Sequence, residues 1–167
     1  LYELHPADYQ ALQDNLRPLR LDRRLHVAQS DGFAGLIARL PPPSRRAVIL
    51  IDLPYEQKSD YQTVLDTLAA AHKRFADGCY LIWYPCLARA ESRRFPAALR
   101  ARFPHDYLRT ELHVRPARDD YGMHGSGLFL INPPYTLPAE LATTLPALQR
   151  LCAADGDGSI VLEADIR

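Results

Sequence analysis

Apolar residues occur along the chain in blocks whose spacing predicts strands and helices in turn. Ala47–Ile51 is an unbroken aliphatic run, the pattern of a strand buried on both faces, and Cys79–Tyr84 is a second apolar run. Between them, apolar residues recur at helical spacing from Tyr61 to Phe75, with Ser59 as the expected N-cap. A strand, a helix and a second strand in this order are typical of a parallel sheet covered by helices.

The flanking segments continue this alternation. We expect further helices over residues 6–16 and 33–40, in the arginine-rich stretch that follows Tyr84 and runs to about Phe103, and over residues 138–152, the last one kinked or shortened by Pro146. We expect further strands over residues 1–4, 25–28, 107–115, 127–131 and 159–163. The sequence therefore predicts one α/β domain over residues 1–167, with a mostly parallel sheet and antiparallel edge strands.

Composition fits a folded protein but gives no general attraction to nucleic acid. The chain is 47% hydrophobic and its formal net charge at pH 7 is zero. Eight arginines nevertheless lie between residues 89 and 118, at positions 89, 93, 94, 100, 102, 109, 115 and 118. Guanidinium groups bind phosphates in a planar, two-pronged geometry, so this segment is a candidate surface for RNA phosphates. A solvated helical face explains the same charges equally well.

The cysteines and the hydropathy limit the other function classes. Cys79, Cys86 and Cys152 lack the spacing of a metal or redox motif, and the histidines lack metal spacing as well. We therefore expect no metal site and a reduced, cytoplasmic protein. No stretch approaches the roughly eighteen apolar residues that span a bilayer, so we expect no membrane segment. A monomer is the favoured oligomeric state.

Two short motifs have the residue types needed to methylate the exocyclic amino group of a base. Asp52-Leu53-Pro54-Tyr55 follows one apolar run, and Asn132-Pro133-Pro134-Tyr135 follows another. The amino nitrogen is a poor nucleophile because its lone pair is delocalised into the ring. Its two N–H groups can donate hydrogen bonds to a side-chain oxygen and to a backbone carbonyl. These two acceptors push the nitrogen toward a tetrahedral shape. An aromatic ring can then stack on the extruded base.

Position in the chain separates the two motifs. Ligands of parallel sheets bind outside the carboxyl ends of the strands. Asp52 follows a strand of the parallel part, whereas Asn132 ends a late strand, and a carboxylate is also the stronger acceptor. We therefore predict that Asp52 and the carbonyl of Leu53 accept from the amino group, that Pro54 shapes the loop, and that Tyr55 stacks on the base.

Six segments occur in a fixed order along the chain. They are Glu3-Leu4-His5-Pro6, residues 31–36, residues 51–56, Trp83-Tyr84-Pro85, residues 122–127 and residues 132–135. Together they resemble the bacterial 23S ribosomal RNA adenine methyltransferase J family over essentially the whole chain. The resemblance implies a class I methyltransferase fold, S-adenosylmethionine as the methyl donor, and one adenine of 23S ribosomal RNA as the substrate.

The resemblance also implies roles for three residues near the start of the chain. Glu3 resembles the acid that accepts hydrogen bonds from the ribose hydroxyls of the cofactor. Asp31, together with the backbone of Gly32, resembles the acid that recognises the cofactor adenine. Without the family, Glu3 is simply an exposed acid and Asp31-Gly32 is a turn.

Two departures from the family pattern affect the expected activity. Leu53 stands where the family has proline, and since proline would restrict the loop, we expect lower or altered activity. The family's first strand, which lies between the second and the fourth, is not in this sequence. We expect a longer chain or a second molecule to supply it. The alternative function is a truncated or inactive RNA-binding remnant, and a methyltransferase for a small molecule or protein is disfavoured because it rests on the fold alone.

Overall fold

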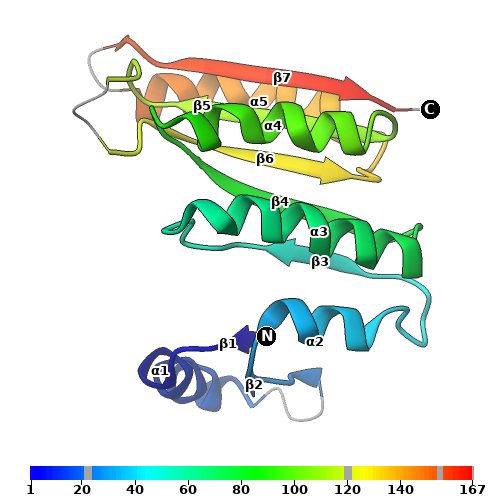
Figure 1. Ribbon diagram of the computed structural model, residues 1–167. Helices are drawn as coiled ribbons and strands as arrows, with labels where there is room; N and C mark the ends of the chain where they lie inside the picture. Colours follow the sequence, from blue (N-terminus) through cyan, green and yellow to red (C-terminus); the bar gives the residue numbers. More distant parts are fainter. Residues whose placement is uncertain (21–23, 119–121, 154–155, 167) are drawn as a thin grey trace.

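A computed structural model describes residues 1–20, 24–118, 122–153 and 156–166, and it has the expected α/β fold (Figure 1). The first half of the chain contains β1 (Tyr2–Glu3), α1 (Pro6–Leu16), the 3-10 helix η1 (Arg17–Leu19), β2 (Ala28–Gln29), α2 (Gly32–Arg39), β3 (Val48–Ile51) and α3 (Lys58–Arg74). The second half contains β4 (Cys79–Cys86), α4 (Ala90–Arg102), β5 (Tyr107–His113), β6 (Gly125–Ile131), α5 (Leu137–Cys152) and β7 (Ser159–Asp165).

The main sheet has five strands in the order β3-β4-β6-β5-β7. β3 and β4 are parallel, while β6 is antiparallel to both β4 and β5, and β7 is antiparallel to β5. Thus β3, β4 and β5 run in one direction and β6 and β7 in the other. Antiparallel pairing therefore extends into the middle of this sheet, because β6 returns beside β5 and inserts next to β4.

A second, two-stranded sheet holds β1 and β2 in parallel pairing. In β3 the side chains of Val48 and Leu50 are 73% and 62% exposed, unlike those of a strand buried on both faces. The prediction of a fully buried strand over residues 47–51 therefore holds only for Ile51, which is 7% exposed.

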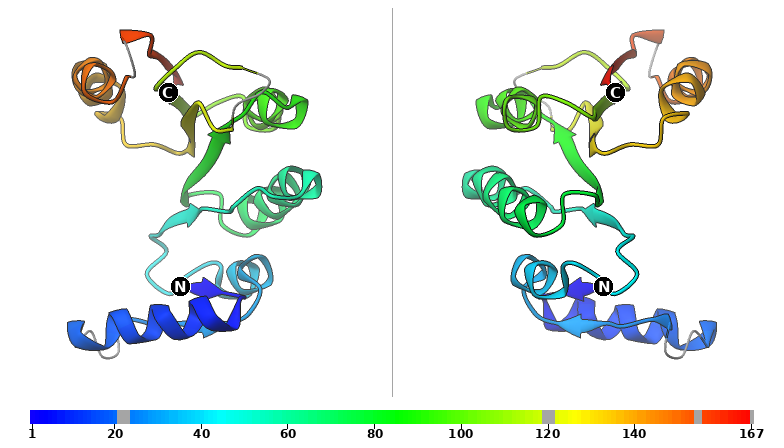
Figure 2. Two further views of the ribbon diagram at one scale, coloured as in Figure 1. Left: turned by 90° about the vertical axis from the view of Figure 1, so that its left-hand side faces the viewer. Right: turned by 90° about the vertical axis from the view of Figure 1, so that its right-hand side faces the viewer.

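Helices cover both faces of the sheet. Figure 2 shows α2, α3 and α4 on one face and α5 on the other. The core lies between α3, α4 and β4, and its fully buried side chains include Val64, Leu68, Tyr84, Phe95 and Leu99. None of the described helices is long and apolar enough to cross a membrane.

Two local predictions about the helices need correction. Ser59 does not cap α3. The first residue of the helix is Lys58, the residue before Ser59. The carboxylate of Asp60 accepts a hydrogen bond from the N–H of Gln57 at 3.0 Å. Helix α5 runs through Pro146 and keeps its expected length, since it spans Leu137–Cys152.

Candidate functional site

The loop after β3 carries the predicted acceptor. Asp52 follows the last residue of β3 directly, so it lies at the carboxyl end of the parallel strands, and its side chain is exposed. Leu53 is half-buried and packs against the core, while Pro54 is exposed. A carboxylate in this position can reach a ligand outside the sheet, as predicted for Asp52.

Tyr55 points the opposite way, into the core. Its ring is 1% exposed and lies 4.9 Å from the ring of Tyr61 and 5.7 Å from that of Phe95, centroid to centroid. Its hydroxyl donates to the carbonyl of Trp83 at 2.8 Å, and burial raises the pKa of this hydroxyl well above its ordinary value. The prediction that Tyr55 stacks on a base does not fit this structure, because no face of the ring is accessible. Tyr55 anchors the loop.

Arg89 holds the same loop from the start of α4. Its Nη2 donates to the backbone carbonyl of Tyr55 and, at 3.0 Å, to the hydroxyl of Tyr61. The guanidinium carbon also lies 5.3 Å from the centroid of the Tyr61 ring, within range of a cation–π contact. Sequence reasoning placed Arg89 among the surface arginines. Its position immediately before a helix gave no sign that its partners lie about thirty residues earlier.

Glu3 and Asp31 come together at the ends of two adjacent strands. Glu3 ends β1, whose partner β2 ends at Gln29, and Asp31 follows two residues later as the N-cap of α2. Glu3 Oε1 accepts from the N–H of His5 at 2.8 Å, and Asp31 Oδ1 accepts from the N–H of Phe33 at 2.9 Å. In each carboxylate the second oxygen makes no described hydrogen bond. Two acids with a spare oxygen fit the hydroxyl and amino donors of a nucleoside.

Gly32 is the first residue of α2 and packs against β1. A Cβ at this position would lie 3.3 Å from Cβ of Tyr2, so a larger residue would push α2 away from the strand. Gly35 is tighter still, since a Cβ there would lie 2.3 Å from Cε1 of Tyr2. The two glycines therefore allow α2 to approach β1 closely and set the position of Asp31.

The second motif, which begins at Asn132, lies at the opposite end of the strands from Asp52. Ile131 pairs with Tyr80 near the beginning of β4, so Asn132 lies at the amino end of the strands whose carboxyl end leads to Asp52. The Asn132 amide donates to the carbonyls of Ala76 and Gly78 at 2.6 and 2.8 Å. Its φ of 53° lies in the left-handed region, which asparagine tolerates better than most residues. Asn132 therefore fixes a turn.

A cavity of about 390 Å³ lies beside this turn, on the side away from Asp52. Its lining includes His72, Lys73, Arg102 and Asn132. None of the residues predicted to bind the base or the cofactor lines this cavity.

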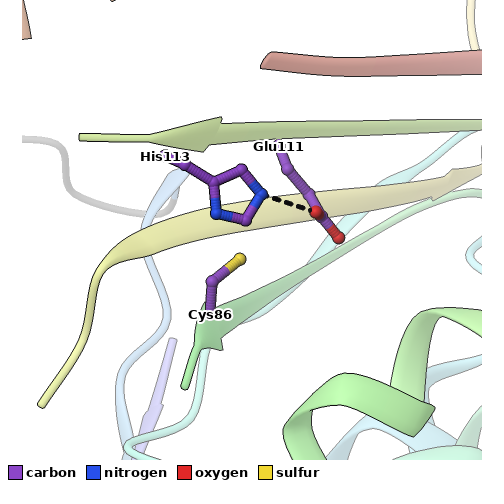
Figure 3. A group of neighbouring side chains, drawn as sticks. All are labelled: Cys86, Glu111 and His113. Atoms are coloured by element: carbon purple, nitrogen blue, oxygen red, sulfur yellow. Dashed lines mark hydrogen bonds and ion pairs between the residues drawn. The ribbon is translucent and has the colours of Figure 1, made fainter. Parts of the chain in front are cut away.

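Cys86, Glu111 and His113 form a buried polar cluster at the end of β4 and β5 (Figure 3). Their side-chain donor atoms lie within 4.8 Å of one another. Glu111 Oε1 accepts from Tyr84 and Arg109, each at 2.8 Å, and Oε2 accepts from His113 Nε2 at 2.9 Å. Burial raises the pKa of the Cys86 thiol to about 12. Both carboxylate oxygens of Glu111 accept hydrogen bonds, and its negative charge is paired with the guanidinium of Arg109. We therefore interpret this cluster as structural.

The arginine-rich segment divides into two groups. Arg89, Arg100, Arg109 and Arg115 contact other parts of the fold, for example through an ion pair of 2.7 Å between Arg100 and Glu163. The remaining arginines are exposed, and none has a described side-chain hydrogen bond or ion pair within the described ranges; they are Arg93, Arg94, Arg102 and Arg118. The guanidinium groups of this second group have no described partner that a phosphate would have to replace.

Comparison with known proteins gives consistent results. The family model described as "Ribosomal RNA large subunit methyltransferase D, RlmJ" matches residues 1–163. The chain is 41% identical over 163 residues to Ribosomal RNA large subunit methyltransferase J of Haemophilus influenzae, and 43% identical over 158 residues to the protein of that name from Escherichia coli. These matches cover 98% and 95% of the chain but 57% and 55% of the relatives, so the chain spans about half their length.

A solved structure matches along the whole chain. The crystal structure of protein LPL1258 from Legionella pneumophila superposes with a TM-score of 0.86 at 34% sequence identity. The match covers 100% of this chain and 61% of the Legionella chain. The fold is therefore shared over every element described above.

Proposed function

Because the chain belongs to the ribosomal RNA large subunit methyltransferase J family, we propose that it takes part in transferring a methyl group from S-adenosylmethionine to the exocyclic amino group of an adenine in 23S ribosomal RNA. The observation that carries this proposal is the placement of Asp52. It is an exposed carboxylate directly after β3, at the edge of the sheet where parallel strands bind ligands.

In the proposed reaction the protein acts on the amino group of the base. The carboxylate of Asp52 and the backbone carbonyl of Leu53 accept hydrogen bonds from the two N–H groups of this amino group. These bonds localise the nitrogen lone pair for attack on the methyl group. Pro54 limits the conformations of the loop behind these acceptors. Tyr55 holds the loop to the core through its buried ring, and we assign it no stacking role.

Glu3, Asp31 and Gly32 would hold the cofactor. The spare oxygens of Glu3 and Asp31 suit the ribose hydroxyls and the adenine amino group respectively, and the backbone of Gly32 lies next to Asp31. S-adenosylmethionine supplies the methyl group when bound. No metal is needed for this reaction, because the acceptors alone activate the nitrogen.

The exposed arginines are the proposed contacts for RNA phosphates. Arg93 and Arg94 project from α4, which begins just after the carboxyl end of β4 and so lies near the edge of the sheet that holds Asp52. Their charges are not neutralised by a described ion pair, so they can bind phosphates at moderate salt. Ribosomal RNA as the substrate places the proposed activity in the cytoplasm.

Asp52→Ala, which removes the side-chain acceptor oxygens altogether, tests the assignment in the complete gene product. We expect methyl transfer to 23S ribosomal RNA to fall about 100- to 1,000-fold, as when one acceptor or donor for the transition state is lost, with RNA affinity nearly unchanged. Asp77→Ala is the matched control, because Asp77 is also exposed but lies at the opposite end of the strands from Asp52. Equal turnover in the Asp52 and Asp77 variants would exclude Asp52 as the acceptor. RNA binding by a wild-type protein that binds no cofactor in calorimetry would favour the RNA-binding remnant.

A further inference from the structure

Arg89 contacts a segment far from it in the sequence. It lies between β4 and α4, and its guanidinium reaches back to the loop after β3, thirty-four residues earlier in the chain. There one terminal nitrogen donates to both the Tyr55 carbonyl and the Tyr61 hydroxyl. The planar guanidinium can make both bonds while lying over the Tyr61 ring, whereas a lysine ammonium lacks this shape.

The loop that Arg89 reaches has an unfavourable backbone conformation. Tyr55 has a φ of 51°, in the left-handed region, and a non-glycine residue held there costs about 1–3 kcal/mol. Such a conformation persists only where the surroundings impose it. Here the Tyr55 hydroxyl is bound to the Trp83 carbonyl at 2.8 Å, and Lys58 pairs with Glu91 of α4 at 3.2 Å. Arg89 supplies the contact with the Tyr55 backbone itself.

The burial of this guanidinium has a cost. Its Nε is buried and has no hydrogen-bond partner among the described residues. A buried donor without a partner costs about 1–3 kcal/mol, so stabilisation of the fold is a poor explanation for keeping an arginine here. A role in holding one loop conformation explains why Nη2 of Arg89 binds the loop while its buried Nε is left without a partner.

We propose that Arg89 is a positioning residue for the acceptors at Asp52 and Leu53, an inference that rests on the proposed function. By fixing the Tyr55 carbonyl, Arg89 fixes the end of a segment that begins with Asp52 only three residues earlier. This chain has Leu53 where proline would restrict the backbone, so the loop lacks that local source of rigidity. The contact from Arg89 supplies the rigidity from outside the loop.

Arg89→Ala and Arg89→Lys test this role in the complete gene product. We expect kcat for methyl transfer to fall about 10- to 100-fold in both variants, because small displacements of acceptor groups cost rates of this size. KM for RNA and for the cofactor should change less than about two-fold, since Arg89 contacts neither in the proposal. Added guanidinium ion should restore part of the kcat of Arg89→Ala, which a general loss of folding would not allow. Arg150→Ala, which removes an exposed arginine of α5, is the control expected to keep wild-type rates.

A second readout does not depend on activity. Lys58 and Lys73 lie at the two ends of α3, so endoproteinase Lys-C cleavage can be compared at one bond next to the loop and one bond far from it, with mass spectrometry to identify the peptides from these two sites. Release of the loop in Arg89→Ala or Arg89→Lys should raise cleavage at Lys58 several-fold relative to Lys73. The rate ratio in Arg150→Ala should equal that of the wild type.

The two readouts separate failure of this inference from failure of the proposed function. An unchanged cleavage ratio overturns the role of Arg89, whatever happens to kcat. A raised ratio with unchanged kcat in an active enzyme overturns positioning of the acceptors as well. If the wild type transfers no methyl group to RNA, the proposed function fails, and with it the assignment of acceptors. The cleavage ratio then still decides whether Arg89 holds the loop.

Discussion

Glu111 should make the stability of this protein depend on pH in acid. Its side chain is 7% exposed and accepts hydrogen bonds from Tyr84, Arg109 and His113. Burial by itself raises the pKa of this carboxyl, but the three hydrogen-bond donors outweigh burial and lower the pKa from 4.5 to about 2. A difference of this size corresponds to about 3 kcal/mol of stability in the ionised form.

The sign follows from the direction of the shift. The folded protein holds this proton less tightly than the unfolded chain, so the stabilisation is fully present above about pH 5. It is lost as the pH falls through the unfolded value and then toward the folded pKa of about 2. At pH 3 about 1.5 kcal/mol should remain.

Urea unfolding of the wild type and of Glu111→Gln at pH 6 and pH 3 measures the stabilisation that the ionised Glu111 carboxylate provides. The difference in the free energy of unfolding between the two proteins should be about 3 kcal/mol at pH 6 and about half of that at pH 3. Glu140→Gln, at an exposed carboxylate of α5, is the control and should change stability by less than about 0.5 kcal/mol at either pH. A Glu111→Gln difference that is the same at both pH values would refute a lowered carboxyl pKa.

Two further predictions concern packing and turn geometry. Gly127→Ala should lower the free energy of unfolding by about 1–3 kcal/mol, because the new Cβ would lie 2.3 Å from Cζ of Tyr84 in the core; Gly122→Ala, with nothing within 4 Å, should be nearly neutral in the same urea titration. Asn132→Ala should cost about 2 kcal/mol in urea unfolding, since it removes two hydrogen bonds and places alanine at a φ of 53°, whereas Asn132→Gly should cost less because glycine adopts this φ freely. Equal losses in the two Asn132 variants would mean that the backbone conformation contributes nothing.

The alternation of strands and helices could be predicted because it depends on the spacing of hydrophobic residues that are close together in the sequence. The runs around β3 and β4 and the helical pattern from Tyr61 to Phe75 depend only on neighbours in the sequence. The contacts around the candidate site do not. Arg89 reaches a carbonyl thirty-four residues away, and a surface arginine and a buried one have the same local pattern. No local sequence feature distinguishes Arg89 from the exposed Arg93.

The direction of Tyr55 could not be predicted for a different reason. An aromatic residue three positions after an acid that is expected to face a ligand suggests a ring that faces the same ligand. A φ of 51° at Tyr55 accompanies a side chain that points into the core instead, and contacts from residues distant in the sequence, such as Phe95 and Arg89, hold that conformation. The prediction for Asp52 was safer because it depended on strand order rather than on one dihedral angle.

The two similar motifs show why strand direction outweighs residue type in assigning such a site. By exposure alone, the motif at Asn132 is the better candidate for stacking on a base, because Tyr135 is 85% exposed and Tyr55 is 1% exposed. Yet Asn132 ends a strand that runs against β4, so it lies at the sheet edge away from Asp52, and its amide is already bound to two carbonyls. An acceptor for the base must lie where the parallel strands end. Of these two motifs, only the one at Asp52 meets this condition, and in the proposed reaction any ring that stacks on the base comes from elsewhere than Tyr55 in this loop conformation.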